Sequence, residues 1–250
     1  MIEYKFDKEK HLHQLKVNGE WKNLTGCTTV LGILAKPALI TWAAKMTVEW
    51  IKENAQKEVT TDGKQAWLVD EEDLEEAKKA HAKRKTDAGN YGTETHEAIN
   101  RLIEDAIKNN NGYLKETLDK VNASILNFGK WAVENKVKFL ETEKNIYSEF
   151  LFTGGIIDFV CEIGGQIWLG DIKTSGSGIY PEHFFQIAGY NLMLEEMGLY
   201  KDATGYLVIN LKENGEMLEK RNVSNDENKQ IFRNCLEIYR VQEKLKNNIK

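Results

Sequence analysis

The sequence has few cysteines, no long hydrophobic run and no excess of positive charge. Three cysteines, Cys27, Cys161 and Cys235, lie far apart, which excludes zinc and iron–sulfur spacing and fits reduced, buried thiols. No hydrophobic run approaches the length of a transmembrane helix, and the charged N-terminus is unlike a secretory signal. We therefore expect a cytoplasmic protein with no membrane partner.

The composition is that of an ordinary globular protein. Hydrophobic residues make up 41% and charged residues 29%, and six Trp, nine Tyr and nine Phe argue against disorder. A chain of 250 residues can form one sizeable core, or a core with a helical extension. The net charge of −5 gives no global attraction to nucleic acid, so any such binding must depend on local charge.

Hydrophobic periodicity predicts an α/β protein with a mixed central β-sheet flanked by helices and a helical N-terminal region. One domain is expected, with a hairpin and helices over 1–85 and the core over 86–250. Residues 59–64 are predicted to form a loop. Strands are expected at 4–17 with 21–24, and at 145–152, 156–163, 166–173, 204–211 and 216–223. Helices are expected at 28–34, 38–54, 70–85 and 87–107 (two helices or one), at 182–197 and at 225–247. One or two more are expected within 115–142, with an end or turn at Asn135.

A predicted hairpin contains the most informative residues of the chain. Two β-branched and apolar runs flank Gly164-Gly165, a pair that suits a two-residue turn. That turn places Asp158 opposite Asp171 and Ile156 opposite Lys173, with all four side chains on one face. Two carboxylates directly opposite each other repel, which lowers the hairpin's stability or raises one pKa unless a divalent cation binds between them. The alternative is a surface hairpin with a simple Asp–Lys ion pair.

The predicted strands are apolar on both faces, so we expect a sheet that is covered on both sides. Asp158 and Lys173 then lie among apolar neighbours and must be paired or bind a ligand. One face is expected to carry Ile157, Phe159, Cys161 and Ile163, and the other Ile156, Val160 and Leu169.

Two polar residues follow the hairpin on a predicted helix. Gln186 and Tyr190 are four residues apart and share one helix face, although a single helical Gln more often faces solvent. The intervening segment, Ser175-Gly176-Ser177-Gly178, contains two glycines that let a substrate approach the backbone closely.

His96 is the histidine with the most suggestive context. It follows Ala88 and Gly92 at spacings of four, so two small residues share its helix face and permit close approach to the sheet or to DNA. A lone helical His is more often a surface or core residue than a metal ligand. Glu143 and Glu149 precede the hairpin and could add negative charge, but neither is selected as a site residue.

A basic run follows an acidic run before His96. Pairs such as Glu75–Lys79 and Glu76–Lys79 favour a solvated helix face. The alternative is a helix whose basic half, with Lys83, Arg84 and Lys85, guides a DNA backbone, while Tyr91 stacks on bases.

Four motifs together resemble the PD-(D/E)XK nuclease superfamily, specifically its RecB-like exonuclease branch. They are Gly92-x-x-x-His96, Gly155-Ile156-Ile157-Asp158, Asp171-Ile172-Lys173-Thr174 and Gln186-x-x-x-Tyr190. Ile157 replaces the proline of the superfamily's name. The segment 30–42 also resembles phage-encoded and mitochondrial members. Members with an iron–sulfur cluster need four clustered cysteines, so the resemblance is to those without a cluster.

The resemblance implies a restriction-endonuclease-like core and a role for each matched residue. It implies that Lys173 orients or activates the attacking water and stabilises charge on the phosphate, while Gln186 and Tyr190 position the lysine or the DNA. Because imidazole suits softer metals than Mg²⁺, His96 would slightly favour Mn²⁺. The implied ligands of the Mg²⁺ or Mn²⁺ ion are His96, Asp158, Asp171 and the backbone carbonyl of Ile172.

The leading hypothesis is a metal-dependent DNA exonuclease of viral (phage) or plasmid-like origin. It acts on DNA ends or single strands in recombination or DNA processing, with a recombination partner protein. The second is a structure- or site-specific endonuclease on the same core. The third is a catalytically silent nucleic-acid-binding module, which the intact Asp158, Asp171 and Lys173 argue against. A non-nuclease metalloenzyme is the fourth, and the absence of a His/Cys cluster argues against it.

Overall fold

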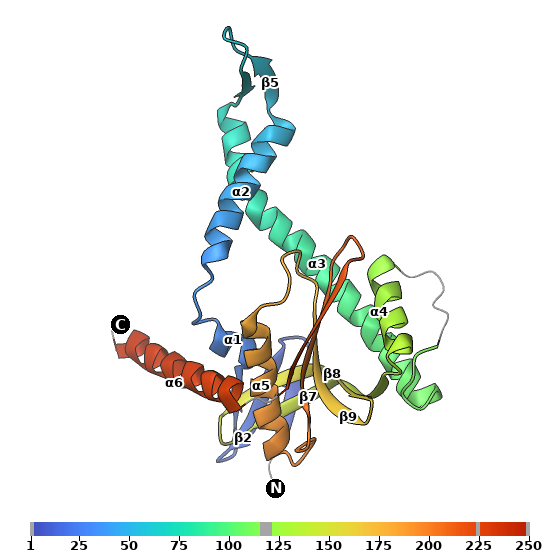
Figure 1. The fold of residues 1–250 in the computed structure, drawn as a ribbon. Helices are drawn as coiled ribbons and strands as arrows, with labels where there is room; N and C mark the ends of the chain where they lie inside the picture. The colour runs from blue at the N-terminus through green and yellow to red at the C-terminus, as the bar shows by residue number, and fades with distance from the viewer. Residues whose placement is uncertain (1–2, 116–121, 224–225, 249–250) are drawn as a thin grey trace. The chain divides into compact units, whose positions relative to one another are not determined.

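The computed structural model describes residues 3–115, 122–223 and 226–248, apart from the side chains at 37 and 38 (Figure 1). Its contacts define two compact units. One is Ala35–Thr93, and the other joins Met1–Leu34 to Glu94–Lys250. The division therefore differs from the expected one at 85/86, because the first 34 residues belong with the C-terminal part of the chain.

The smaller unit contains two helices and a hairpin. Helix α2 (Pro37–Asn54) is followed by strands β5 (Gln56–Val59) and β6 (Gln65–Leu68), and then by the first part of α3 (Glu71–Asn109). The loop predicted at 59–64 is the turn between β5 and β6, apart from Val59, which ends β5. The antiparallel pairing of these two strands was not predicted. Helix α3 is a single helix that continues past Thr93 into the larger unit.

A mixed central sheet forms the larger unit, as the sequence predicted. Strand β8 (Thr153–Ile163) pairs antiparallel with β7 (Lys138–Ser148) and β9 (Gln166–Lys173), and parallel with the short β4 (Thr25–Gly26). Strand β10 (Gly205–Leu211) pairs parallel with β9 and antiparallel with β11 (Met217–Val223). Helix α5 (Pro181–Glu196) makes the crossover between the parallel strands β9 and β10, which such a pair requires.

Helices cover both faces of this sheet, which confirms the expectation of a doubly covered sheet (Figure 1). Helices α1 (Cys27–Leu31), α5 and α6 (Asp226–Asn248) enclose one core cluster, and α4 (Ala123–Glu134) with the second part of α3 encloses the other. One assignment was wrong: Ile157 belongs to the α5-side cluster with Val160, whereas Phe159 belongs to the α4-side cluster. The regular alternation of faces is thus broken next to Asp158.

The N-terminal strands pack against the start of β8. Strands β1 (Tyr4–Asp7), β2 (Leu12–Val17) and β3 (Glu20–Asn23) form a three-stranded antiparallel sheet rather than the expected two-part hairpin. A Cβ atom on Gly154 would lie 2.5 Å from the Cβ of His13, a buried residue of β2. This contact and the β4–β8 pairing explain why the first 34 residues belong to the larger unit.

The end or turn predicted at Asn135 is confirmed. Helix α4 ends at Glu134, where Asn135 caps it and Lys136 adopts a left-handed φ of 51°. Residues 138–142 belong to β7, which corrects both the helix predicted within 115–142 and the predicted strand start at 145. Residues 116–121, and residue 225 at the start of the last predicted helix, lie outside the described residues. None of the helices in the described ranges combines the length and apolar composition that crossing a bilayer requires.

Candidate metal centre

Strand β8 has a short stretch where one of its edges has no neighbouring strand. Strand β7 pairs with β8 along nearly its whole length, so β9 and β4 must share the opposite edge. On that edge, β9 pairs with β8 from Ile163 back to Phe159, and β4 pairs only with Thr153 and Gly154. Residues 155–158 lie between these two pairings, so the candidate site is built where the sheet opens.

The predicted hairpin register is confirmed up to this opening. Phe159 pairs with Gly170, as the Gly164-Gly165 turn requires, but the next pair, Asp158 with Asp171, is not part of the ladder. Instead the backbone N–H of Ile172 donates a hydrogen bond of 2.6 Å to Oδ2 of Asp158. A side-chain carboxylate thus takes the place of a backbone acceptor, and the two strands separate.

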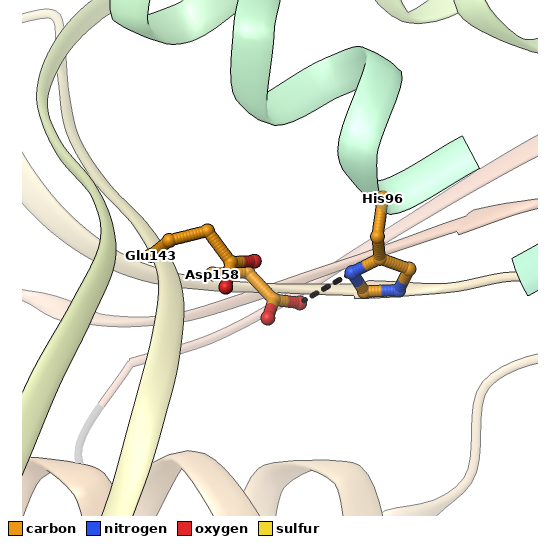
Figure 2. Close-up of side chains that lie close together, drawn as sticks. All are labelled: His96, Glu143 and Asp158. Carbon is orange, nitrogen blue, oxygen red and sulfur yellow. Dashed lines mark ion pairs between the residues drawn. The ribbon is translucent and has the colours of Figure 1, made fainter. Parts of the chain in front are cut away.

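Three potential metal ligands converge at the opening. One ligand atom from each of His96, Glu143 and Asp158 lies within 4.8 Å of the others. Figure 2 shows His96 on α3 directed toward Asp158, and Nδ1 of His96 lies 3.7 Å from Oδ2 of Asp158. Glu143 and Asp158 come from the adjacent strands β7 and β8. The three side chains are therefore brought together from a helix and two strands.

The backbone around these side chains is fixed by a specific contact and includes one strained residue. The hydroxyl of Thr142 lies 2.8 Å from the Asn100 side chain and 3.1 Å from the carbonyl of Asp158. Because Asn100 is one helical turn after His96, this contact ties the histidine's helix face to β7 and β8. Glu143 has a φ of 44°, which is costly for a residue other than glycine and is typical of functional sites.

A second polar network adjoins Asp158. Lys173 Nζ lies 2.7 Å from Oδ2 and 3.0 Å from Oδ1 of Asp171, which is 1% exposed. Lys173 also donates to Oε1 of Gln186 at 3.2 Å, while Gln186 Nε2 lies 3.2 Å from Asp171 Oδ1 and 2.6 Å from the hydroxyl of Tyr190. Tyr190 packs where a Cβ on Gly155 would lie, 2.6 Å from its ring. The lysine is thus fixed by one carboxylate and one amide.

Burial sets the protonation behaviour of these groups. Desolvation raises the pKa of Asp158, Asp171 and Glu143, although His96 or Lys173 partly offsets this. Burial alone would lower the pKa of Lys173, but the two aspartates raise it above its usual value, so Lys173 is a cation at neutral pH. The pKa of Tyr190 is raised well above its usual value by burial, so its phenol is neutral. The site therefore combines carboxylates that favour a bound cation with one fixed positive charge.

The structure brings most of the predicted site residues together, but the three-residue cluster differs in one member from the predicted set of metal ligands. His96 and Asp158 are in the three-residue cluster as expected. Asp171, a predicted ligand, pairs with Lys173, and Glu143 takes the third position in the cluster. Ile172 contributes the N–H that it donates to Asp158, whereas its carbonyl was the predicted ligand.

The predicted DNA-binding residues lie in the smaller unit. Lys83, Arg84 and Lys85 are exposed on α3, and Tyr91 is half-buried. Of the ion pairs predicted in the preceding segment, Glu76–Lys79 forms at 2.9 Å, whereas Glu75 pairs with Lys78 instead of Lys79. The solvated-face interpretation of that segment is consistent with these pairs.

Glu143 was missed for a physical reason. The sequence predicts helix within 115–142 and a strand only from 145, so Glu143 lies in the gap between the predicted elements. In the structure, Thr142 pairs with Phe159 and Lys144 pairs with Ile157, so Glu143 lies opposite Asp158. If the strand had been predicted to begin at 138, the sequence would have shown an acidic residue, Glu143, opposite Asp158.

This ligand set fits a divalent cation. Two carboxylates supply the oxygen ligands that Mg²⁺ and Mn²⁺ use, and one imidazole is more usual for Mn²⁺ and later transition metals. The absence of cysteine from the cluster argues against a structural zinc site of the thiolate type.

Comparisons with known proteins do not identify the chain. No protein-family model matches it, and no curated protein matches it. Among solved structures, SSO0001 is similar over 47% of this chain and 58% of its own length, with 17% sequence identity and a TM-score of 0.30. The chain thus spans little more than half of SSO0001, and a likeness this low carries no argument about function.

Replacing Glu143 by Gln is expected to weaken Mn²⁺ binding by at least about tenfold, because it removes one charged ligand from a three-residue set. Thermal unfolding of the full chain with Mn²⁺ or with EDTA measures this, since a ligand that binds only the folded state raises Tm. The matched control is Glu149→Gln, which removes an exposed carboxylate six residues further along the chain. An unchanged Mn²⁺ response in Glu143→Gln would show that Glu143 is not a ligand.

Proposed function

We propose that this protein is a metal-dependent nuclease that hydrolyses phosphodiester bonds of DNA as an exonuclease on ends or single strands. One observation carries the proposal. The His96–Glu143–Asp158 cluster is joined, through the Asp158–Ile172 hydrogen bond, to the strand that holds the Asp171–Lys173 ion pair. A cation site and a fixed lysine cation side by side suit a substrate that carries a scissile phosphate.

Each group has a specific task in such a reaction. A divalent cation bound there would polarise a phosphoryl oxygen and lower the pKa of a bound water. Lys173, held as a cation by Asp171, stabilises the negative charge that develops on the phosphate. Gln186 holds the lysine from the other side, and Tyr190 orients Gln186. The Lys173 side chain therefore loses little conformational entropy when a substrate binds.

The buried charges favour an enzyme over a silent binding module. Asp158 and Asp171 have raised pKa values because burial disfavours their charged forms, so keeping them costs folding free energy. A module that only contacts a DNA backbone has no use for carboxylates inside its core. An endonuclease on the same core remains the second candidate, and the substrate's topology distinguishes the two.

Cleavage assays test the proposal directly. The substrates are end-labelled linear single- and double-stranded DNA and closed circular DNA, each with Mg²⁺, Mn²⁺ or EDTA. We expect the protein to degrade linear DNA only, and to do so only with Mg²⁺ or Mn²⁺. Lys173→Ala and Asp171→Ala should each abolish this degradation.

The remaining outcomes are informative. Opening of the circle with the same metal dependence would assign an endonuclease. The protein could instead cleave none of these DNAs although it is folded and its Tm rises with metal. That result would contradict a deoxyribonuclease. The same assay with labelled RNA then decides between a ribonuclease and a binding module.

A further inference from the structure

A small cavity lies at the N-terminal end of α5, beside strand β11 and the start of α6. It has a volume of about 260 Å³, slightly below the ~300–1,000 Å³ of sites for drug-sized ligands. It therefore has room for one small planar group rather than an extended ligand. Its lining combines three aromatic rings with polar groups, namely Tyr180, Phe184, Phe185, Lys220, Asn222 and Asn228.

The cavity is joined to the candidate metal centre by a short, well-anchored segment. Six residues separate Lys173 from Tyr180, and the Asn210 side chain donates to the carbonyl of Ser175 within that segment. On α5, Gln186 contacts Lys173 and lies six residues after Tyr180, which is about 9 Å along a helix axis.

The aromatic ring at the mouth of the cavity is already oriented. Tyr180 is 40% exposed, its hydroxyl donates to the carbonyl of Ser177 at 3.3 Å, and its ring packs edge-on against His183 with centroids 5.9 Å apart. The backbone N–H of Tyr180 also donates to Nδ1 of His183 at 3.3 Å. An exposed ring that is fixed in this way loses little freedom when a ligand stacks on it.

The other groups of the lining select the class of ligand. Asn222 carries an amide group, which matches the donor and acceptor edges of a nucleobase, and the exposed Lys220 supplies a positive charge for a phosphate. Asp226 and Glu227 begin α6 next to Asn228, so the Lys220 side of the cavity is the side that favours an anion. Bases inside a duplex are stacked on one another and cannot enter such a cavity, whereas bases of a single strand can.

We propose that this cavity is a subsite for one nucleotide of a DNA single strand, whose base stacks on Tyr180 and whose phosphate contacts Lys220. This inference rests on the proposed nuclease function and names the form of DNA that the site takes. It places a bound base at the N-terminal end of the helix whose Gln186 contacts Lys173.

Equilibrium binding of a fluorescent single-stranded oligonucleotide in EDTA tests the subsite without any cleavage. We expect Tyr180→Ala to weaken binding by about 5- to 150-fold, the range for losing one base–aromatic stack. Tyr180→Phe should restore most of that loss, because the ring remains. Lys220→Gln should weaken binding and reduce the slope of log affinity against log salt by about 0.7. The control is Phe150→Ala, which removes an 88% exposed aromatic ring from the β7–β8 turn.

Three results would overturn the subsite. The first is that Tyr180→Ala binds the single strand as tightly as the wild type, and the second is that Phe150→Ala loses as much affinity as Tyr180→Ala. The third is that Tyr180→Ala weakens binding of a duplex as much as binding of a single strand. Cleavage assays on the same preparations separate this failure from failure of the proposed function. If metal-dependent cleavage persists while the single-strand effect is absent, the subsite alone is wrong. If neither cleavage nor single-strand binding occurs, both proposals are wrong.

Discussion

Replacement of Asp158 by Asn is expected to reduce DNA cleavage by about 10³-fold or more, with the fold retained. Asp158 is shared between the three-residue ligand cluster and the hydrogen bond to Ile172. A metal ion contributes several kcal/mol of transition-state stabilisation, and about 4 kcal/mol corresponds to about 10³ in rate. An Asn side chain can still accept the Ile172 N–H through its carbonyl oxygen, so the strand opening is preserved while the ligand charge is lost.

The same substitution should not reduce stability in the absence of metal. Burial raises the pKa of Asp158 in the folded state, so ionisation of this group destabilises the fold as the pH rises through the unfolded-state pKa and up to the folded one. Asn removes that cost. We therefore expect Asp158→Asn in EDTA to be at least as stable as the wild type at neutral pH. This advantage should disappear in acid, where the carboxyl group is protonated in both states.

Two measurements check this prediction. One is the cleavage rate at saturating Mn²⁺, and the other is the free energy of unfolding in EDTA at neutral and acid pH. The control is Asp202→Asn, which removes an exposed carboxylate outside the site. Unimpaired cleavage by Asp158→Asn would rule out Asp158 as a ligand. Destabilisation in EDTA at neutral pH would instead show that its charge is compensated in the folded protein.

The hairpin register could be predicted from sequence because local chemistry determines it. The Gly164-Gly165 turn and the alternation of apolar residues specify one pairing, and the ladder follows it as far as Phe159 and Gly170. The next pair is lost because the Asp158 carboxylate accepts the Ile172 N–H, an interaction that no pattern of alternation encodes. The motif thus indicated the region where His96, Glu143 and Asp158 converge, but it did not show that the sheet opens there.

The ligand set was harder to predict because it depends on a neighbouring strand. Whether Glu143 or Asp171 completes the cluster with His96 depends on where β7 begins and on the left-handed backbone of Glu143. Neither feature follows from residue spacing within the hairpin. The division into two units was equally inaccessible, because the β4–β8 pairing that brings the first 34 residues to the core is a contact of only two residue pairs.

Substitution of Gly170 by Ala is expected to destabilise the protein by about 2–3 kcal/mol, as overpacking of a core does. A Cβ atom at this position would overlap the ring of Phe159. That ring cannot move aside easily, since Phe159 is fully buried and packs edge-on against Phe139 with centroids 5.7 Å apart. Strands β8 and β9 must therefore separate locally to accept one methyl group.

The same clash should reach the metal centre. Gly170 directly precedes Asp171, and Phe159 directly follows Asp158, so separating this last pair of the ladder displaces both carboxylates. We expect Gly170→Ala to lose Mn²⁺-induced stabilisation as well as stability, although it changes no ligand. Urea unfolding with tryptophan fluorescence, with and without Mn²⁺, measures both effects.

A matched control and a second substitution separate this explanation from a general effect of Ala. Gly176 lies in the same unit, has no atom within 4 Å of an added Cβ and does not have a left-handed φ, so Gly176→Ala should be neutral or stabilising by about 0.4–1 kcal/mol. Phe159→Leu shortens the obstructing side chain, so the double substitution Gly170→Ala/Phe159→Leu should lose less stability than the sum of the single changes. If the loss of stability in the double variant equals the sum of the two single losses, the methyl group does not act through Phe159. In that case, the close approach of β8 and β9 is not what holds the two carboxylates in place.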